Sequence, residues 1–522
     1  MQSSKGGHLA QQPAGVPDDV EAVPRKGTQT NPKAACRRSS FGEVMFKIHD
    51  GVSWQVLALC LGMVAIGLTL GLVFGLAIND DKDDPVAPFF VRQEDATESA
   101  QCTLQVTEAQ YFNVTTFSDG QGTLLLNKFN KKAYVLVPAA SEMTLAAAEA
   151  KAAPLIPSGY NTSAFQTPLD NVTVTETQLT TYIELLGARR TISEMSSYTT
   201  SPCLQKLRLE GDVSYFTGAT WDPTFKAESP NVHFTGYTAH ELADSVVQCA
   251  VSVEQRDGTM LQSSEWIKFF APFFGKECEA NAIFDRIKER YACHKAKVDE
   301  VYSSLPPVKV AVTERNFGYD CADTMGEGCD PTYNTAPYFG VTDAEYWKSY
   351  IQDAGGSLMT ETTMLGGTAL DTTKDAFVYE SEAAFHDVLK EASVLIDQTY
   401  FAEGNVTLAK ILDAYGLTLE DTDYPFIRDK AIWRNDRRVS AYNDGNDWFE
   451  SRYPEADVLL EDMIFTVHPM YSEWLVNPGH SMTWLRNMFT GAEQIELTAA
   501  MCEDPNAAAK LIADECTSIR TN

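Results

Sequence analysis

The chain has 522 residues, of which 44% are hydrophobic and 22% charged, enough apolar material for a large buried core. Its formal net charge is −31, and beyond residue 51 there are 34 Lys and Arg against 67 Asp and Glu. Nucleic acids need a positive surface, so this composition argues against nucleic-acid binding. It is typical of solubility in a salty medium, or of attraction for a cationic ligand.

Residues 52–78 contain no charged side chain, which is long enough for a transmembrane helix. Basic residues precede this stretch, and the acidic run 80–84 follows it, so the positive-inside rule places residues 1–51 in the cytosol as a disordered tail. Residues 79–101 are an acidic stalk. We therefore expect a single-pass type II membrane protein whose C-terminal domain is extracellular or lumenal, at the plasma membrane or an endosome.

The exported part carries nine cysteines and four glycosylation sequons, at Asn113, Asn161, Asn171 and Asn405, which fits an oxidising secretory compartment. The first expected disulfide joins Cys321 to Cys329, and the second joins Cys502 to Cys516. Two further cysteines at 278 and 293 lie about 22 Å apart on one expected helix, so they cannot pair with each other. Because nine is odd, one thiol is free or intermolecular.

The region 102–262 alternates strand and helix patterns and predicts a first lobe. Residues 146–153 are of low complexity and suggest a surface insertion. A long helical pattern covers 263–305; Pro272 should kink or split it, and the uninterrupted part, 277–303, is about 40 Å long. The expected strands here are 133–138, 171–175, 190–193 and 250–254, and the expected helices are 176–186 and 201–207.

The region 306–491 predicts a second lobe, followed by a Cys-bearing tail, 492–522. The fold class is therefore α/β: two Rossmann-like lobes with mostly parallel sheets, joined by a long bridging helix over 263–305, plus the N-terminal transmembrane helix. The expected strands of the second lobe are 308–313, 393–397 and 430–433, and the expected helices are 343–354, 381–391, 408–415 and 482–489.

The order of these pieces resembles the class III substrate-binding proteins, the periplasmic-binding-protein family that serves iron–siderophore and cobalamin uptake, here in a membrane-anchored eukaryotic version. The resemblance covers about 165–490 and implies a ligand held between two lobes. It is carried by the following segments: TETQ at 175–178, ELLGA at 184–188, EWIKFF at 265–270, FFGKECEAN at 273–281, YIQDAGG at 350–356, 392–397 and PEADVLLED at 454–462.

Ligands of open α/β sheets bind at the carboxyl ends of the strands. In this chain those ends are 175–177, 196–198, 314–319 and 434–436. Arg315 could clamp a carboxylate or hydroxamate oxygen, because a guanidinium donates bidentately, or it could lie in an ordinary solvated loop. Arg434 either attracts an anionic complex or pairs with neighbouring carboxylates. The candidate ligand-binding residues are Glu314, Arg315, Phe317, Tyr319, Tyr198 and Arg434.

We expect a cell-surface receptor that captures a small chelate, an iron–siderophore complex or cobalamin, between its lobes for uptake. A transporter, a reductase or an endocytic partner would receive the cargo. The sequence contains no GxSxG, P-loop or HExxH pattern and no zinc spacing, so we expect no enzyme, no metal site and no cofactor. The alternative is a non-catalytic structural or adhesion ectodomain on the same fold.

Overall fold

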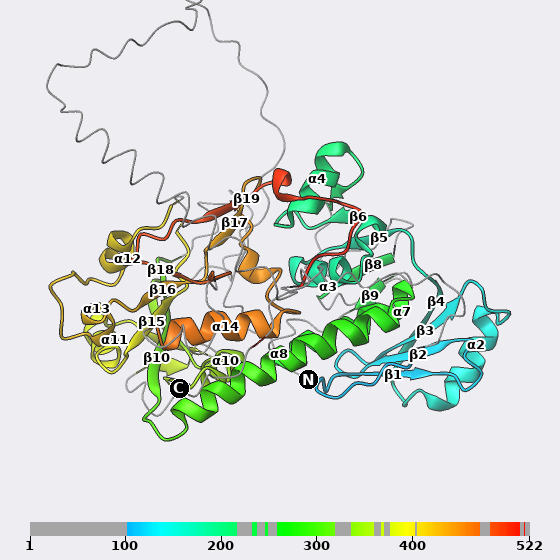
Figure 1. The fold of residues 1–522 in the computed structure, drawn as a ribbon, viewed down its shortest axis with the longest axis horizontal. Coiled ribbons are helices and arrows are strands. Elements are labelled where there is room, and N and C mark those ends of the chain that lie inside the picture. The colour runs from blue at the N-terminus through cyan, green and yellow to red at the C-terminus, as the bar shows by residue number, and fades with distance from the viewer. Residues whose placement is uncertain are drawn as a thin grey trace, which may run out of the picture. The chain divides into compact units, whose positions relative to one another are not determined.

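The computed structural model describes residues 102–216, 232–236, 246–248, 258–318, 336–359, 367–369, 376–401, 405–469, 481–511 and 516. The expected tail, transmembrane span and stalk, residues 1–101, lie outside these ranges, as do the expected strand 250–254 and the expected Cys321–Cys329 pair. Within the described ranges, no helix combines the length and the apolar composition that crossing a bilayer requires. The chain is a mixed α/β protein (Figure 1).

The described chain begins with a four-stranded sheet in the order β1-β2-β3-β4. Only β3 was expected. The segment 146–153, interpreted from its composition as a surface insertion, falls mostly in helix α2. Most of its residues are exposed, while Ala148 and Ala152 are buried in a small core with Phe117. Its small side chains allow the helix to lie close to the sheet. The bounds are Phe112–Thr116 for β1, Thr123–Asn127 for β2, Lys132–Pro138 for β3, Leu145–Ala152 for α2 and Asn161–Thr167 for β4.

A five-stranded parallel sheet follows, in the order β7-β6-β5-β8-β9. The expected strands 171–175 and 190–193 and the expected helices 176–186 and 201–207 are confirmed to within a few residues. Gly187 ends the first of these helical segments with a φ of +72°, a conformation that favours glycine. The bounds are Val172–Val174 for β5, Thr180–Leu185 for α3, Ile192–Met195 for β6, Pro202–Glu210 for α4, Ser214–Tyr215 for β7, Val232–Thr235 for β8 and Val246–Gln248 for β9.

The third sheet has eight strands and is mixed, so the expectation of a mostly parallel second sheet is wrong. Strands β12, β10, β15 and β16 are parallel neighbours, whereas β11, β13, β14 and β18 are joined through antiparallel pairs. The bounds are Val308–Asn316 for β10, Tyr338–Thr342 for β11, Gly356–Leu358 for β12, Thr368–Ala369 for β13, Ala376–Tyr379 for β14, Val394–Asp397 for β15, Ile432–Arg434 for β16 and Arg486–Asn487 for β18.

Three of the four helices expected in the second lobe are confirmed, as α10, α11 and α12. The fourth, a helix at 482–489, is wrong, because the segment contains β18, which pairs with β16. Helix α14 is buried along most of its length, in the same hydrophobic core as the eight-stranded sheet and its neighbouring helices. The bounds are Glu345–Asp353 for α10, Glu382–Leu389 for α11, Leu408–Ala414 for α12, Pro425–Arg428 for α13 and Ala456–Val467 for α14.

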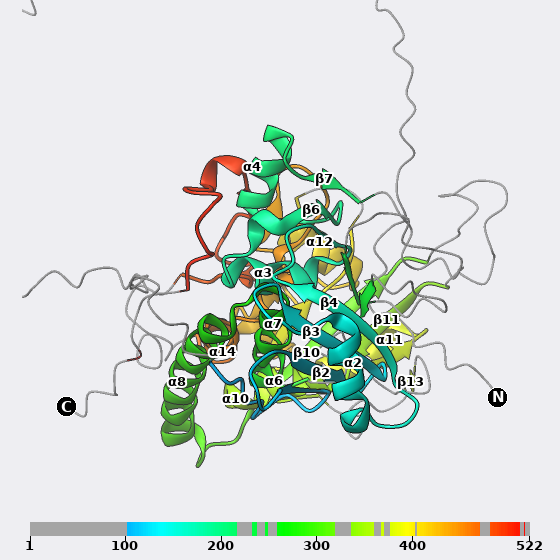
Figure 2. The ribbon, with the colours of Figure 1, turned by 90° about the vertical axis from the view of Figure 1, so that its right-hand side faces the viewer.

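Three helices replace the single long helix expected over 263–305: α6 (Met260–Glu265), α7 (Ile267–Phe274) and α8 (Glu277–Tyr302). Pro272 lies inside α7, and the break before α8 is at Gly275, whose φ is +64°. We call residues 102–274 the first half and residues 306–491 the second half. Helix α8 buries residues in the hydrophobic cores of both halves and lies alongside α14 (Figures 1 and 2).

Three disulfides join described residues: Cys102–Cys278, Cys203–Cys502 and Cys293–Cys516. The expected Cys502–Cys516 bond is therefore wrong, since each of these residues pairs with a distant partner. Cys278 and Cys293 both lie on α8 and do not pair with each other, as expected. All four sequon asparagines have exposed side chains, at positions 113, 161, 171 and 405.

Candidate functional site

Aromatic side chains follow two neighbouring parallel strands where each strand ends. Phe317 comes directly after β10, and Tyr400 and Phe401 come shortly after β15. The exposed fractions are 53% for Phe317 and 61% for Tyr400, while Phe401 is half-buried. The ring centroids of Phe317 and Phe401 lie 5.9 Å apart. We call these three residues the aromatic edge. It lies where open α/β sheets bind ligands.

A buried chain of alternating charges lies at the ends of the same strands. It runs from Asp397 through Arg434 and Asp436 to Arg486, and all four side chains are almost fully buried. Arg434 Nε lies 2.9 Å from Asp436 Oδ2, and Arg486 Nε lies 2.6 Å from Asp436 Oδ1. The charges cancel, and each buried ion has a partner of opposite sign. We call this set the ion chain.

The ion chain fixes the backbone that carries the aromatic edge. Asp397 Oδ1 accepts hydrogen bonds from Thr399 N (3.2 Å) and from the Tyr415 hydroxyl (2.5 Å). Arg434 Nη2 donates to the carbonyl oxygen of Thr399 at 3.1 Å. Burial, together with the neighbouring Asp397 carboxylate, raises the pKa of Tyr415 well above its usual value, so this phenol stays a donor. The residue immediately before Tyr400 is thus held on both of its backbone polar groups.

Arg434 takes part in this pairing, which is one of the two roles that its sequence context left open. Its Nε, Nη1 and Nη2 all donate within the protein, and its side chain is 7% exposed. An anion would have to displace Asp397 or Asp436 to reach the guanidinium. The neighbouring Arg438 also pairs internally, with Asp447 at 3.2 Å. We therefore leave Arg434 out of the ligand-contacting set proposed below.

Arg315 lies beside the aromatic edge, inside β10, because the strand continues to Asn316 rather than ending at 313 as expected. Its Nη1 donates to the carbonyl oxygens of Asn316 and Tyr338, both at 2.8 Å. The guanidinium carbon lies 4.2 Å from the ring centroid of Phe339 and 5.6 Å from that of Phe317. Within the described part of the chain, no hydrogen bond uses its Nε or Nη2. The side chain is thus oriented while keeping donors for another group.

Glu314 is the neighbouring residue on β10, and it accepts a hydrogen bond from the Tyr338 hydroxyl at 2.8 Å. Burial raises the pKa of Glu314, and the nearby Asp397 carboxylate raises it further. Across the sheet, Gly340 leaves the room that this carboxylate occupies, since a Cβ there would lie 2.9 Å from Glu314 Cγ. The remaining candidate on this segment, Tyr319, lies outside the described residues.

Tyr198 is the candidate from the first half. It follows β6 in the turn that leads to α4, and its side chain is half-buried. Burial raises the pKa of Tyr198, and the charges of Asp444 and Tyr400 raise it further. The main chain of Tyr198 lies against Gly445 of the second half.

The turn that carries Tyr198 contacts the second half directly, through a loop that sequence reasoning missed. Glu450 accepts hydrogen bonds from the backbone N–H groups of Thr200 (2.6 Å) and Ser201 (2.9 Å). Asn443 Nδ2 donates to the Thr199 carbonyl oxygen at 3.1 Å. Gly445 is required here because a Cβ would lie 2.2 Å from the Tyr198 carbonyl oxygen. The Asn-Asp-Gly-Asn turn sequence at 443–446 was the available signal.

Two carboxyl groups at the boundary between the halves have raised pKa values. Glu176 lies at the carboxyl end of β5 and accepts hydrogen bonds from Thr235 Oγ1 (3.1 Å) and Gly236 N (2.6 Å). Burial raises the pKa of Glu176 to about 7. Burial also raises the pKa of Glu450 well above its usual value, and the charge of Asp447 adds to this. Glu176 can therefore hold a proton near neutral pH.

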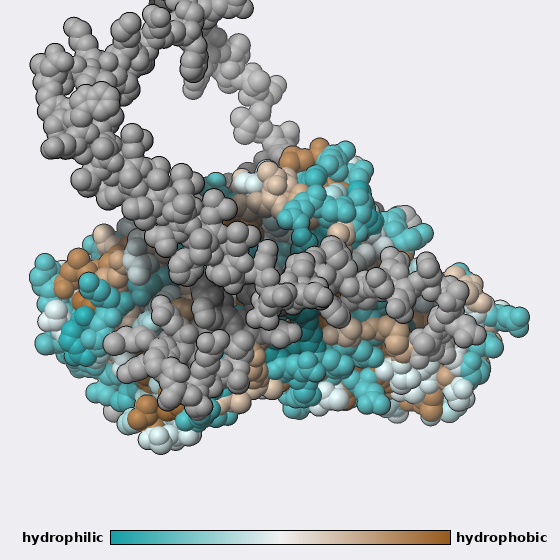
Figure 3. Space-filling view, in the orientation of Figure 1, coloured by the Kyte–Doolittle hydropathy of each residue, from teal (hydrophilic) through white to brown (hydrophobic). Residues whose placement is uncertain are grey.

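Metal binding by the protein itself finds no support within the described ranges, where no cluster of three or more His, Cys, Asp or Glu side chains is arranged to hold an ion. A hollow of about 450 Å³ lies on the four-stranded sheet and shares no residue with the aromatic edge. It is lined by Cys102, Thr103, residues 114–118 and Gly120. Elsewhere, hydrophilic residues cover most of the coloured surface in Figure 3, and hydrophobic residues form separate small patches.

No protein-family model matches the sequence, and no curated protein is similar to it. Among solved structures, the chain is similar to the TroA-like periplasmic binding protein FepB from Veillonella parvula (14% identity, TM-score 0.38, covering 62% of this chain and 95% of that one). It is also similar to an ABC-type Fe3+-hydroxamate transport protein from Saccharomonospora viridis (13%, TM-score 0.36, 58% and 95%) and to a periplasmic heme-binding protein from Pseudomonas aeruginosa (12%, TM-score 0.36, 58% and 93%).

Proposed function

We propose that this protein is a non-catalytic receptor that binds a small chelate, an iron–siderophore complex or cobalamin, between its two halves. In this proposal the aromatic edge contacts the apolar face of the ligand, and Arg315 donates to an oxygen of its chelating groups. Tyr198 approaches from the first half. The proposed contact set keeps Phe317, Arg315 and Tyr198 from the residues predicted from the sequence. It adds Tyr400 and Phe401 and leaves out Glu314, Tyr319 and Arg434.

The observation that carries the proposal is the exposure of two large aromatic rings on a rigid support. Exposed apolar side chains that gather at one place mark binding sites more often than chance surface residues do. Here Phe317 and Tyr400 follow adjacent strands, and the buried ion chain holds the residue before Tyr400. A preorganised support lowers the entropy lost when a ligand binds. A rigid support of this kind is expected beneath a binding site and is not needed beneath a mobile surface loop.

The same proposal includes a bridging helix between the halves and an N-terminal membrane anchor. Helix α8 acts as a bridging helix, because Phe284 packs in the core of the first half and Ile287 in that of the second. At its centre, Arg290 pairs with Asp457 and Glu461 of α14, and all three side chains are buried. The protein would be a type II membrane protein anchored through residues 52–78, with the halves outside the cytosol. A transporter, a reductase or an endocytic partner would then take the cargo.

Binding is tested by titrating the chain with a ferric trihydroxamate and, separately, with cobalamin, and following tryptophan fluorescence and heat release. We expect saturable binding of one of them. Replacing both Phe317 and Tyr400 by alanine should weaken it at least tenfold, since buried aromatic contacts at binding sites contribute about 1–2 kcal/mol each. Leu419→Ala is the matched control, because Leu419 is 55% exposed and lies outside the aromatic edge. Unchanged affinity in the double variant would overturn the contact assignment.

One observation favours the alternative, a structural or adhesion ectodomain. The halves already touch through hydrogen bonds, such as that from Thr177 Oγ1 to the Phe449 carbonyl oxygen at 2.9 Å. If this contact continues across the whole boundary, no chelate can enter. Failure of every chelate in the titration to change fluorescence or release heat, with the protein folded, would support this alternative.

A further inference from the structure

The C-terminal segment leaves the second half and crosses to the first. We call residues 495–516 the strap, of which 495–511 and 516 are described. It begins with β19 (Ile495–Leu497), which pairs in parallel with β17 (Arg438–Ser440). Its start is fixed to the second half, since Ile495 N donates to the Arg437 carbonyl oxygen at 2.6 Å and Ala441 N donates to that of Leu497 at 3.1 Å.

The start of the strap is also connected to the ion chain. Gln494 Nε2 donates to Asp436 Oδ2 at 3.2 Å, and Arg486 Nη1 donates to the Ala492 carbonyl oxygen at 3.2 Å. Both Asp436 and Arg486 are buried members of the ion chain. The strap therefore starts from a rigid part of the second half.

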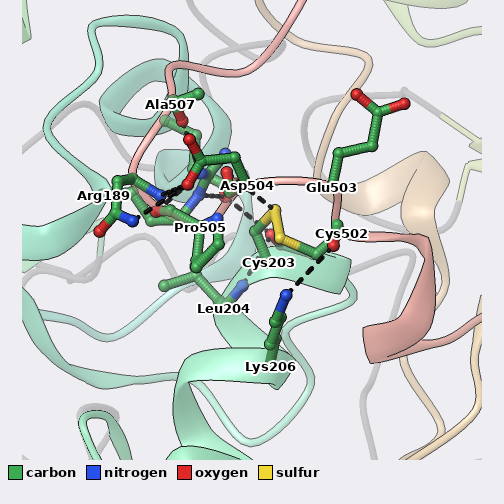
Figure 4. The surroundings of a disulfide bond; sticks show 12 residues. Arg189, Cys203, Leu204, Lys206, Cys502, Glu503, Asp504, Pro505 and Ala507 are labelled. Atoms are coloured by element: carbon green, nitrogen blue, oxygen red, sulfur yellow. Dashed lines mark hydrogen bonds and ion pairs between the residues drawn. A yellow bond between two sulfur atoms is a disulfide. The ribbon is translucent and has the colours of Figure 1, made fainter.

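The middle of the strap is covalently bound to the first half. Cys502, immediately after the short turn Ala499–Met501, forms a disulfide with Cys203 of α4. Lys206 of the same helix donates from Nζ to the Cys502 carbonyl oxygen at 3.4 Å. Figure 4 shows the disulfide, with Lys206 on one side and Arg189 on the other.

Beyond the disulfide, the strap follows the surface of the first half. Arg189 Nη1 donates to the carbonyl oxygens of Pro505 (3.2 Å) and Ala507 (2.7 Å), and Ala509 N donates to the Glu184 carbonyl oxygen at 2.9 Å. Arg189 is itself buried and paired with the Glu184 carboxylate. The strap then reaches α8, where Cys516 is bonded to Cys293.

We propose that the strap is a brace that fixes the separation of the two halves. The chain passes from the first half to the second through α8 and returns over α4 through the strap; Figures 1 and 2 show the two crossings on different sides of the molecule. The α8 crossing alone permits rotation about its axis, and the hydrogen bonds between residues 199–201 and 443–450 oppose that rotation only non-covalently. A second crossing, covalently closed at Cys203–Cys502, opposes that rotation because the strap would have to leave α4 or β17. This inference does not depend on whether a ligand binds.

The test is a distance distribution between the halves in the full-length chain. Spin labels are placed through unnatural amino acids at Glu210 of α4 and Ala409 of α12, both of which are exposed, and double electron–electron resonance is recorded. In the wild-type background we expect one narrow distribution. In Cys203→Ala/Cys502→Ala we expect a broader one, shifted to longer distances.

The matched control is Cys102→Ala/Cys278→Ala, which removes a disulfide between the N-terminal segment and α8 that does not involve the strap. This control should keep the wild-type distribution. A wild-type distribution in Cys203→Ala/Cys502→Ala, or equal broadening in both double variants, would overturn the proposal. If the first variant does not fold, a protease site inserted between Thr498 and Ala499 allows the strap to be cut in the folded chain, and the same broadening is expected.

Discussion

The two halves present opposite kinds of surface in the segments that follow their strands. On the first half, the Thr199 carbonyl oxygen and the backbone N–H groups of Thr200 and Ser201 form hydrogen bonds to the second half, and all three residues are buried. On the second half, Phe317 and Tyr400 remain more than half exposed, while the charges nearby are buried and paired. One surface is closed by contact between the halves, and the other is kept rigid but open.

This difference predicts that stability and ligand affinity depend on different groups of residues. The groups that join the halves should affect stability without changing ligand affinity. The groups at the aromatic edge should affect affinity while hardly changing stability. The ion chain should affect both, because it supports the edge from inside the core. Each of the following changes tests whether stability and ligand affinity depend on different residues. Failure of any one expected result would contradict that separation.

The largest effect is expected for Asp397→Ala. This change leaves Arg434 buried beside a lost partner, and breaking a buried ion pair from one side costs about 3–5 kcal/mol. Urea unfolding of the variant should show that loss in the free energy of unfolding. Asp387→Ala is the control, since it removes the partner of Lys390 in an exposed pair and should cause no measurable change. Equal stability of the two variants would show that the ion chain is not a rigid support.

Glu450→Ala should have the next largest effect, on stability alone. It removes the acceptor of two buried backbone N–H groups, those of Thr200 and Ser201, at a cost of about 2 kcal/mol. The measurement is again urea unfolding, combined with a chelate titration. We expect lower stability and unchanged affinity per folded molecule. A large loss of affinity without loss of stability would mean that Glu450 contacts the ligand.

Arg315→Ala should act in the opposite way, on affinity. Loss of one charge-assisted donor weakens binding by about 1.4 kcal/mol, which is roughly tenfold. Arg428→Ala is the control, because Arg428 is an exposed arginine that pairs only with its neighbour Asp429 among the described residues. Calorimetric titration with the ferric trihydroxamate measures the dissociation constant of each variant. Identical dissociation constants for the two variants would remove Arg315 from the site.

A further effect concerns pH. The pKa of Glu176 is about 7 in the folded protein because of burial, above its ordinary value of 4.5. A carboxyl group with a raised folded-state pKa contributes stability at low pH and loses that contribution as the pH rises through the folded-state value. The wild type should therefore lose stability between about pH 4.5 and 7 relative to Glu176→Gln, which cannot ionise. Thermal melts across this range would contradict the prediction if the difference between the two proteins stayed constant.

Periodicity in the sequence predicted the elements with continuous apolar patterns, and it failed where pairing partners decide the structure. Strands β10, β15 and β16 are apolar runs and were expected close to their observed bounds. Strand β4 has the polar sequence NTSAFQT and is a strand because β3 pairs with it, which no local pattern shows. Likewise, the segment around β18 fits a helical pattern but pairs with β16.

The candidate site was predicted in part for the same reason. The rule that ligands bind at strand ends pointed to Phe317 and Arg315, and it also applied to Tyr400, which follows an expected strand but was not chosen. The role of Arg434 depended on which carboxylates lie near it in space, and Asp397 is 37 residues away along the chain. The contact between Glu450 and Ser201 spans 249 residues and has no local signal.

The central claim, that a chelate lies against the aromatic edge, is tested most directly by fluorine NMR. The chain is labelled with 4-fluorophenylalanine at Phe317 or, as a control, at Phe129 on the four-stranded sheet, and a ferric trihydroxamate is added, with its diamagnetic gallium analogue in parallel. We expect the paramagnetic iron to broaden the signal at 317 strongly and to leave the signal at 129 sharp. If binding is measured by calorimetry and both signals stay equally sharp, the ligand binds elsewhere and the account is wrong.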